Sequence, residues 1–497
     1  MLNRMTPSTW GLAAAILVAI GSYGAGATRN RGGIMRELGL AHLTYGHGRS
    51  IFEIILTVGI AGLVAAWVIL GRDLKRDRAD ATTMARATWA WTLPLAVAAP
   101  ILSRDVYSYL MQGAMLRDGF DPYSEGAAVN PGPYLLEVSH DWRNTTTPYG
   151  PLHLGIGKLI TTVVGENVTL GIVAYKLLSL AGFALIAYCV PRLAARIGGN
   201  PAMAVWLGVL NPVMLLHMVG GMHNESVMVG LVSLGLLLCT SSRWITPGVA
   251  LIALAVALKA TAAVALPFVV WMLYHRHAAA RSSWAGRLGV FVASGAWVVA
   301  ISALVVNLAT VLSGSTWGWI AEISGNSKVV NPLSGPTLVA DVITPAIQLV
   351  NGAFSYNTAL SIARAAAGML MLAGLVVTWV IFHPRGEQTN RRAVMGTTLA
   401  YAIAFTTNAV TLPWYYASVV TLVGTFNPPR WLKKLTIVAS VFVALGFTGS
   451  GNHRLYDAWF LLIAVTAACA AAAWVYPSRT NGAQVQSADP AGAALPR

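Results

Sequence analysis

The chain has 497 residues, of which 56% are hydrophobic and only 10% are charged, and its mean hydropathy is +0.63. Water-soluble domains carry about 25% charged residues, so this composition excludes a soluble globular protein and predicts an all-α polytopic membrane protein. The formal net charge of +15 would favour a nucleic-acid partner in a soluble chain. In a membrane protein, however, Lys and Arg gather in short cytoplasmic loops, so no nucleic-acid partner is expected.

Apolar runs of about 20 residues, the length that crosses a bilayer, recur along the chain. The candidate spans are Trp10 to Ala27, Ile51 to Leu70, Ala85 to Leu102, Thr169 to Val190, Ala202 to Val219, Ser226 to Thr240, Ile245 to Tyr274, Leu288 to Leu312, Thr358 to Phe382, Ala393 to Thr411, Tyr415 to Phe426, Leu435 to Phe447 and Ala458 to Tyr476. Lys259 interrupts the seventh run, which is predicted to be two short helices that meet at this lysine. About fourteen spans then form a single transmembrane domain over residues 1–476. The small, polar segment 477–497 is predicted to be a disordered cytoplasmic tail.

The basic segments between these spans set the predicted orientation. Those that fall on one side are Arg72 to Arg78, Arg192 with Arg196, Arg243, Arg276 to Arg287, Arg385 to Arg392, and Arg430 to Lys434. The positive-inside rule places this side, with both termini, in the cytoplasm. Four arginines do not follow the rule and fall on the outer side: Arg29, Arg31, Arg36 and Arg49.

The first large outer loop, residues 103–168, begins with a candidate catalytic acid. Asp105 lies where the third span emerges, and Tyr109 follows it in a stretch whose helical spacing favours an amphipathic helix in the membrane interface. A carboxylate there can act as a general base that accepts the proton of an attacking hydroxyl. The alternative is a capping pair of Arg104 and Asp105 at a helix N-terminus. Further along the loop, Asp121 precedes a proline, which is typical of a turn, and is also a candidate for orienting substrate.

Three polar residues, His223, Asn224 and Glu225, follow one another at the outer end of the fifth span. Polar side chains between two apolar helices are costly unless they have a role. They could hydrogen-bond a sugar, orient Asp105 or cap a helix. A metal site is a fourth reading, although one turn supplies too few ligands, and no metal is expected.

Lys259 lies deep in an apolar run, which by itself is a functional hypothesis. A lipid phosphate is the expected partner, because a paired ammonium costs far less in a low dielectric than a lone one. Snorkelling of the side chain to the outer interface is the alternative.

The second large outer loop, residues 313–357, contributes Lys328 as a candidate substrate contact. Beyond it, Trp414, Tyr415 and Tyr416 follow a proline at the end of a span. These aromatic side chains could form an interfacial belt, stack on sugar rings or line a groove for an isoprenoid chain. The sequence has no Gly-rich phosphate loop and no metal-spaced cysteines, so no cofactor is expected, and the sugar donor is not expected to be a nucleotide sugar held by a soluble domain.

In the order and spacing of six segments, the sequence resembles the polyprenol-phosphomannose-dependent α-1,6-mannosyltransferases of mycobacteria and corynebacteria, members of the GT-C superfamily. The segments are Ser103 to Tyr109, Asp121 to Tyr123, Tyr149 to Pro151, His223 to Glu225, Lys259 to Phe268, and Leu412 to Tyr416. The likeness is greater to the A-type, chain-elongating enzymes than to the B-type, initiating ones. It implies a GT-C fold with interfacial helices in the outer loops.

The resemblance also implies an activity. The donor would be decaprenyl-phosphate-mannose, and the acceptor a growing lipomannan of the phosphatidylinositol-mannoside type, the precursor of lipoarabinomannan, at the outer face of the plasma membrane. Asp105 would be the base of an inverting transfer, and Lys259 with Arg104 would hold the leaving phosphate. The alternatives are a B-type enzyme, a polyprenyl-lipid transporter or flippase, and a scaffold. A transporter should gather its polar groups near the bilayer midplane, whereas here they gather at the outer ends of spans.

Overall fold

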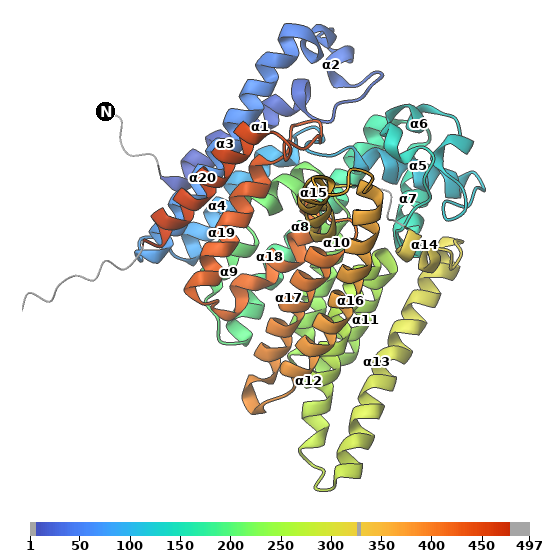
Figure 1. Ribbon diagram of the computed structural model, residues 1–497, viewed down its shortest axis with the longest axis vertical. Helices are drawn as coiled ribbons and strands as arrows, with labels where there is room; N and C mark the ends of the chain where they lie inside the picture. Colours follow the sequence, from blue (N-terminus) through green and yellow to red (C-terminus); the bar gives the residue numbers. More distant parts are fainter. Residues whose placement is uncertain (1–5, 326–329, 478–497) are drawn as a thin grey trace, which may run out of the picture.

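The computed structural model describes residues 6–325 and 330–477, and within these ranges the chain is mostly helical. The helices lie side by side in an elongated bundle (Figure 1). Within the described ranges the β-structure is one isolated antiparallel bridge between Phe447 and His453. Apolar runs of this length become helices because a helix satisfies every backbone hydrogen bond within its own segment, which hydrocarbon requires. The predicted all-α polytopic fold is confirmed.

Six helices in the described ranges are long and apolar enough to cross a membrane, or seven if one bent pair counts as a span. They are α1 (Pro7–Ala25), α3 (Gly46–Lys75), α8 (Val168–Arg196), α13 (Trp284–Ser313), α16 (Tyr356–Ile381) and α20 (Ala458–Val475). The other predicted spans are shorter or less apolar helices: α4 (Ala81–Ala96), α9 (Pro201–Gly208), α10 (Glu225–Cys239), α11 (Ile245–Leu258), α12 (Leu266–Ala278), α17 (Thr389–Thr407), α18 (Ala417–Val423) and α19 (Arg430–Leu445). The chain is therefore a multi-pass membrane protein, and the count of about fourteen spans stays a prediction.

Two helix ends near the outer loops bear on the site. The predicted break at Lys259 is confirmed, since α11 ends at Leu258 and a 3-10 segment, Ala260–Ala265, precedes α12. The predicted span from Ala85 to Leu102 is too long, because α4 ends at Ala96. The residues after it bond to other segments instead: the Ile101 N–H donates to the Gly220 carbonyl over 3.3 Å.

A second layer of short helices covers one end of the bundle. It consists of α2 (Ile34–Glu37), α5 (Asp105–Arg117), α6 (Pro133–Glu137), α7 (Pro151–Val164), α14 (Trp319–Gly325) and α15 (Gly335–Gln348). Figure 1 shows α5 and α6 in the upper half of the molecule, with the turn between α12 and α13 at the lower end and α14 at the upper end of α13. The two regions predicted as large loops thus hold ordered helices.

The position of α5 differs from the expectation. The predicted helix is present, but it does not lie on the surface with one polar face outward, because residues 105–111 are all buried. Helix α7 covers it at very short range. A Cβ atom on Gly113 would lie 2.2 Å from the backbone carbon of Gly157, so the two glycines let the helix backbones touch. This close packing holds the first turn of α5 inside the protein.

In the core beneath this layer, two stacked tryptophans connect helices α3 and α9. Trp67 on α3 and Trp206 on α9 stack with their ring centroids 5.1 Å apart. Each indole N–H donates to the backbone carbonyl of the other tryptophan, over 2.8 and 2.9 Å. Two buried N–H groups are thereby satisfied, which fixes the two helices relative to each other.

Candidate active site

Asp105 is positioned by the non-helical segment between α4 and α5. Leu102 has a positive φ of 62°, and its N–H donates to the Gly449 carbonyl over 2.7 Å. The N–H of Asp105 then donates to the Ser103 hydroxyl over 3.1 Å. Asp105 therefore occupies the first turn of α5 and is only 9% exposed. The free N–H groups of a helix N-terminus favour a negative charge at this position.

Two side chains approach the Asp105 carboxylate. The Tyr109 hydroxyl, one helical turn further on, donates to its Oδ2 over 3.5 Å. Burial raises the pKa of the Tyr109 hydroxyl well above its usual value, so this group stays protonated and can donate. The Nδ1 atom of His223 lies 3.4 Å from the same Oδ2. This approach lacks hydrogen-bond geometry, so it is a close contact that a small rotation of either side chain would turn into a hydrogen bond.

The adjacent His223, Asn224 and Glu225 lie in a sharp bend. A π-helical segment, Met214–Gly220, meets α10 at 113°, and Met222 at the bend has a φ of 55°. The bend turns three polar side chains inward at the start of α10. The Asn224 Nδ2 atom lies 3.2 Å from Nδ1 of His153 on α7. Burial, with the positive charge of Lys259, lowers the pKa of the His153 imidazole to about 3, so this ring is neutral at physiological pH.

Lys259 lies at the break between α11 and α12, where it is 7% exposed. Its ammonium forms a hydrogen-bonded ion pair with Oε1 of Glu225. The Tyr415 ring lies 4.1 Å and the Tyr149 ring 5.3 Å from its Nζ atom. A buried carboxylate and two aromatic faces thus surround the cation, which lowers the cost of its burial.

Gly150 brings Tyr149 to this position. The Gly150 N–H donates to the Leu258 carbonyl over 3.1 Å. A Cβ atom here would lie 2.2 Å from the Ala257 carbonyl oxygen, so a larger residue would push the segment away from the end of α11. The Tyr-Gly-Pro sequence therefore docks on the helix break as well as turning the chain.

Trp414 closes the cluster over the histidines. Its ring stacks on His223 with centroids 3.6 Å apart and an angle of 17° between the planes. His217, from the π-helical segment, lies 5.8 Å from both rings, measured between centroids. Both histidines have 0% exposure.

Unpartnered polar atoms are concentrated in this cluster. Within the described ranges, buried side-chain atoms that lack a hydrogen-bond partner include His153 Nε2, both ring nitrogens of His217 and of His223, Asn224 Oδ1, Glu225 Oε2 and Trp414 Nε1. Each such atom costs about 1–3 kcal/mol if it stays unpaired. A ligand rich in hydroxyl groups could satisfy donors and acceptors alike, so the arrangement suits a sugar.

The structure brings together most of the residues predicted for the site. They are Asp105, Tyr109, His223, Asn224, Glu225, Lys259, Trp414 and Tyr415. Asp121 lies elsewhere and bonds within a turn, where its Oδ1 accepts the N–H of Tyr123 over 3.0 Å. The Tyr416 hydroxyl donates to the Leu333 carbonyl over 3.4 Å, away from the cluster. Lys328 lies outside the described residues.

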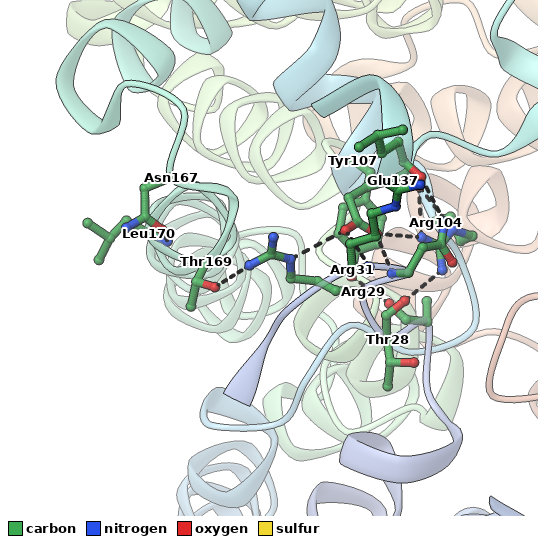
Figure 2. Close-up of polar contacts among 12 residues, drawn as sticks. Thr28, Arg29, Arg31, Arg104, Tyr107, Glu137, Asn167, Thr169 and Leu170 are labelled. Atoms are coloured by element: carbon green, nitrogen blue, oxygen red, sulfur yellow. Dashed lines mark hydrogen bonds and ion pairs between the residues drawn. The ribbon is translucent and has the colours of Figure 1, made fainter. Parts of the chain in front are cut away.

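Arg104 is also directed away from the cluster. It donates to the carbonyl of Glu137 over 2.8 Å and to that of Thr28 over 2.8 Å, and its Nη2 lies 3.3 Å from the Glu137 carboxylate (Figure 2). Glu137 also accepts the backbone N–H of Arg31 over 3.1 Å and pairs with the Arg29 side chain. This arrangement ties the outer loop to the chain that follows α1.

Sequence reasoning missed four residues. Tyr149 entered only as part of a segment that resembles the family, and His153, His217 and Glu137 were not singled out. His217 could have been found, because it is a polar residue inside an apolar run, the same signal that identified Lys259. Nothing in their local sequence distinguishes His153 and Glu137 from ordinary loop residues.

A large cavity lies outside this cluster. It measures about 530 Å³ and is lined by residues of α1, α2, α4, α5 and α8, whereas the cavity beside His153 and His223 measures about 10 Å³. The cluster is the candidate active site, since it contains a carboxylate that can serve as a base, whereas the lining of the large cavity contains none. No three His, Cys, Asp or Glu residues in the described ranges are arranged to hold a metal ion; metal independence stays a prediction.

Comparison with known proteins supports a sugar-transfer site. The model of a family described as alpha-(1->6)-mannopyranosyltransferase, N-terminal domain, matches residues 8–275, and that of the MptB C-terminal domain matches residues 336–477. The chain is 56% identical to alpha-(1->6)-mannopyranosyltransferase A of Corynebacterium glutamicum, over 90% of this chain and 94% of that protein. It is 35% identical to the protein of the same name from Mycobacterium tuberculosis, over 97% and 92%. Identity to alpha-(1->6)-mannopyranosyltransferase B of C. glutamicum is 28%, over 82% and 70%. No solved structure matches the chain.

Proposed function

This chain belongs to the family of α-(1→6)-mannopyranosyltransferases, and from that premise we propose that it transfers mannose from a polyprenyl phosphate to a growing α-1,6-mannan. It is a membrane mannosyltransferase, and the proposal concerns its donor, its acceptor and the side on which it works. The observation that carries the proposal is the buried cluster in which Asp105, the His223 ring and the Lys259–Glu225 pair meet.

Asp105 would act as the general base. It accepts the proton of an acceptor hydroxyl while the oxygen of that hydroxyl forms a bond to C1 of the mannosyl donor. The bond from C1 to the phosphate oxygen breaks, and its electron pair stays on the phosphate, so a β-linked donor gives an α-linked product. One carboxylate suffices for such an inversion, whereas a double displacement would need a second carboxylate as nucleophile.

Lys259 would stabilise the leaving phosphate. Its bond to Glu225 uses one of three N–H donors, which leaves two for phosphate oxygens. The Tyr415 and Tyr149 rings hold the ammonium in place and keep water from it. Arg104, the second residue predicted for this task, is the weaker candidate because its guanidinium already binds Glu137 and Thr28.

The outer face of the plasma membrane is the proposed location of the site. The helices that carry Asp105 and His153 belong to the layer opposite the basic turn between α12 and α13. The positive-inside rule assigns such basic turns to the cytoplasm. A lipid-linked donor suits this side, because it brings an activated sugar to a compartment without nucleotide sugars.

The names and identities of the relatives favour elongation of the backbone over its initiation. Two proteins named as A enzymes are 56% and 35% identical to this chain, and one named as a B enzyme is 28% identical. An assay with acceptors of increasing length tests this assignment. We expect activity to rise with the length of the α-1,6-mannan, and a preference for the shortest acceptor would instead indicate initiation.

A transfer assay tests the proposed reaction. The purified full-length protein is incubated in lipid nanodiscs with radiolabelled polyprenyl-phosphate-mannose and a short α-1,6-mannan, without any ion gradient. We expect labelled α-1,6-linked product from the wild type, and a rate lower by about 10²–10⁴-fold for Asp105→Asn, which keeps the shape of the side chain but cannot take the proton.

Asp118→Asn is the matched control, since Asp118 ends the same helix and is paired with Arg117 on the surface. It should transfer at the rate of the wild type. Full activity in Asp105→Asn would disprove the role of base. Absence of transfer by the wild type, with movement of the intact lipid across the bilayer, would indicate a flippase.

A further inference from the structure

The 530 Å³ cavity lies between α1, α4 and α8 and is capped by the chain around α2. Three basic side chains, Arg29, Arg36 and Lys176, belong to its lining, and no acidic side chain does. Its size falls within the range of about 300–1,000 Å³ that is usual for small-molecule sites. The cavity therefore combines room for a ligand with a positive charge.

Among these basic residues, Lys176 gives the strongest indication of an anion site. It lies eight residues into α8, about 12 Å along the axis from the start of the helix at Val168. The side chain is buried, and its Nζ donates to the carbonyls of Leu95 over 3.2 Å and Val219 over 2.8 Å. No carboxylate in the described part of the chain forms an ion pair with it. A buried ammonium that lacks a counter-charge and lines a cavity is suited to bind an anion.

Part of the cavity wall is apolar and exposed on the outside of the protein. Val97, Val173 and Leu177 line the cavity and are 67%, 48% and 63% exposed. In a membrane protein such exposed apolar side chains contact lipid chains. A hydrocarbon tail can thus enter from the side while its head group meets the basic residues.

The Arg29 side chain is held in place at the rim. Its Nε lies 3.4 Å from Glu137, and its Nη1 donates to the Thr169 hydroxyl over 2.9 Å (Figure 2). Glu137 is shared with Arg104, so one carboxylate faces two guanidinium groups and an excess positive charge remains at the rim. Arg36 is exposed and has no ion-pair partner in the described part of the chain.

Helices α5 and α8 lie between the cavity and the candidate active site, since residues of each line both. Tyr107 lines the cavity, and its hydroxyl donates to the Ala27 carbonyl over 2.7 Å. Asp105, two residues earlier, faces His223 instead. Residues two apart on a helix point to different sides. The phosphate of a reacting donor has to lie next to the carbon under attack, so it cannot occupy this cavity during transfer.

We propose that the cavity binds an anionic phospholipid, with its phosphate between Lys176, Arg29 and Arg36 and its acyl chains along α4 and α8. The site is distinct from the reaction centre and shares the α5 and α8 walls with it. A phosphatidylinositol-type lipid anchor on the acceptor would belong to this class of ligand; that link rests on the proposed function, whereas the lipid site itself does not.

The experiment measures lipid binding to the full-length protein in detergent by native mass spectrometry. The probes are phosphatidylinositol, phosphatidylglycerol, zwitterionic phosphatidylcholine, polyprenyl monophosphate and glycerol 3-phosphate. Polyprenyl monophosphate, the leaving group of the proposed reaction, can bind at Lys259, and Lys176→Met should leave its binding unchanged. We expect both anionic phospholipids to bind more tightly than phosphatidylcholine and glycerol 3-phosphate. Lys176→Met should weaken their binding on the order of tenfold, through loss of a charge-assisted hydrogen bond.

Two further variants guard against misfolding of the Lys176 variant. Arg36→Gln changes an exposed side chain and should weaken binding by a smaller factor, and Val173→Trp should block the cavity without changing any charge. Lys158→Met, the same substitution at a half-buried lysine of α7 outside the cavity, should bind as the wild type does. Equal binding of phosphatidylglycerol and phosphatidylcholine, tighter binding of glycerol 3-phosphate, a loss of polyprenyl monophosphate binding in Lys176→Met as large as that of phosphatidylglycerol, or unchanged phospholipid binding in Arg36→Gln and Val173→Trp would each overturn the proposal. No transfer is measured, so the result does not depend on the proposed function.

Discussion

Lys259 and Lys176 are both buried lysines within apolar runs, but the structure surrounds them differently. Lys259 lies at a helix break, pairs with the Glu225 carboxylate and contacts the faces of two tyrosines. Lys176 lies within the continuous helix α8, donates only to backbone carbonyls and lines a large cavity. The first lysine belongs to a closed, charge-paired cluster, and the second is an unpaired cation beside open space.

The difference shows that the same sequence signal can indicate two kinds of site. A cation with an internal counter-charge can be held rigidly, which suits a group that has to meet a reacting phosphate in a fixed geometry. A cation without one has a free charge for a bound anion and needs room for it. Substitutions at and around the two lysines should therefore have different effects on stability and on binding.

The largest expected effect is the loss of protein stability when one member of the Lys259–Glu225 pair is replaced. Glu225→Gln leaves a lone buried ammonium, and Lys259→Met leaves a lone buried carboxylate. Each should lower the free energy of unfolding by roughly 3–5 kcal/mol. The double variant removes both charges and should recover most of this loss, while transfer activity stays low because the phosphate contact is gone. The measurement is the thermal unfolding midpoint in detergent, with a transfer assay on the same samples.

Lys176→Met supplies the matched comparison for these stability measurements. It breaks no ion pair, and of the two carbonyls that it releases, that of Leu95 still accepts the N–H of Ala98 over 3.2 Å. Its cost should therefore be smaller, about 1–3 kcal/mol. If the two Lys→Met variants lose equal stability, or if the double variant is no more stable than the single variants, the distinction between the two lysines is wrong.

A second effect concerns the ring that faces the proposed base. His223→Asn removes the imidazole that contacts Asp105 and stacks on Trp414. Because the position of the base is then less well defined, the transfer rate should fall on the order of 10- to 100-fold, with little change in phospholipid binding at the cavity. His277→Asn, at an exposed histidine near the end of α12, is the control and should have no effect. If His223→Asn transfers at a rate within twofold of the wild type, or if the rate falls by the same factor in both variants, His223 does not belong to the site.

The smallest expected effect is that of Tyr109→Phe. The Tyr109 hydroxyl donates to Asp105 over 3.5 Å, a long bond worth no more than about 0.5–1.5 kcal/mol. The transfer rate should therefore fall less than about tenfold. Steady-state kinetics with the lipid donor measure this. A loss as large as that of Asp105→Asn would show that Tyr109 has a direct role in the reaction, and Tyr107→Phe, on the cavity side of α5, should leave the rate closer to that of the wild type.

Several parts of the site could be predicted because their signal is local. Asp105 follows a span, His223 to Glu225 interrupt two apolar helices, and Lys259 interrupts a third apolar run. In each case a polar residue lies where hydrocarbon would exclude it, so the sequence alone indicates a role. Lys176 and His217 carry the same signal and could have been identified in the same way.

Other features depend on contacts between distant segments. Nothing local to Glu137 predicts that it meets Arg29 and Arg104, which lie 108 and 33 residues away. The direction of Arg104, expected toward a lipid phosphate, is set by these partners and by Thr28. The burial of α5 follows from the contact of Gly113 with Gly157 on α7.

The sequence by itself determined that the chain is helical and lies in a membrane, which polar residues interrupt its apolar runs, and which family it resembles. These properties follow from composition and from spacing along one helix, both of which act over a few residues. The tertiary structure decided that Lys259 pairs with Glu225, that Lys176 remains without a counter-charge beside a cavity, and that α8 lines both this cavity and the pocket beside His223. Those outcomes depend on how helices distant in the sequence pack, because an ion pair or a cavity exists only between the segments that form it.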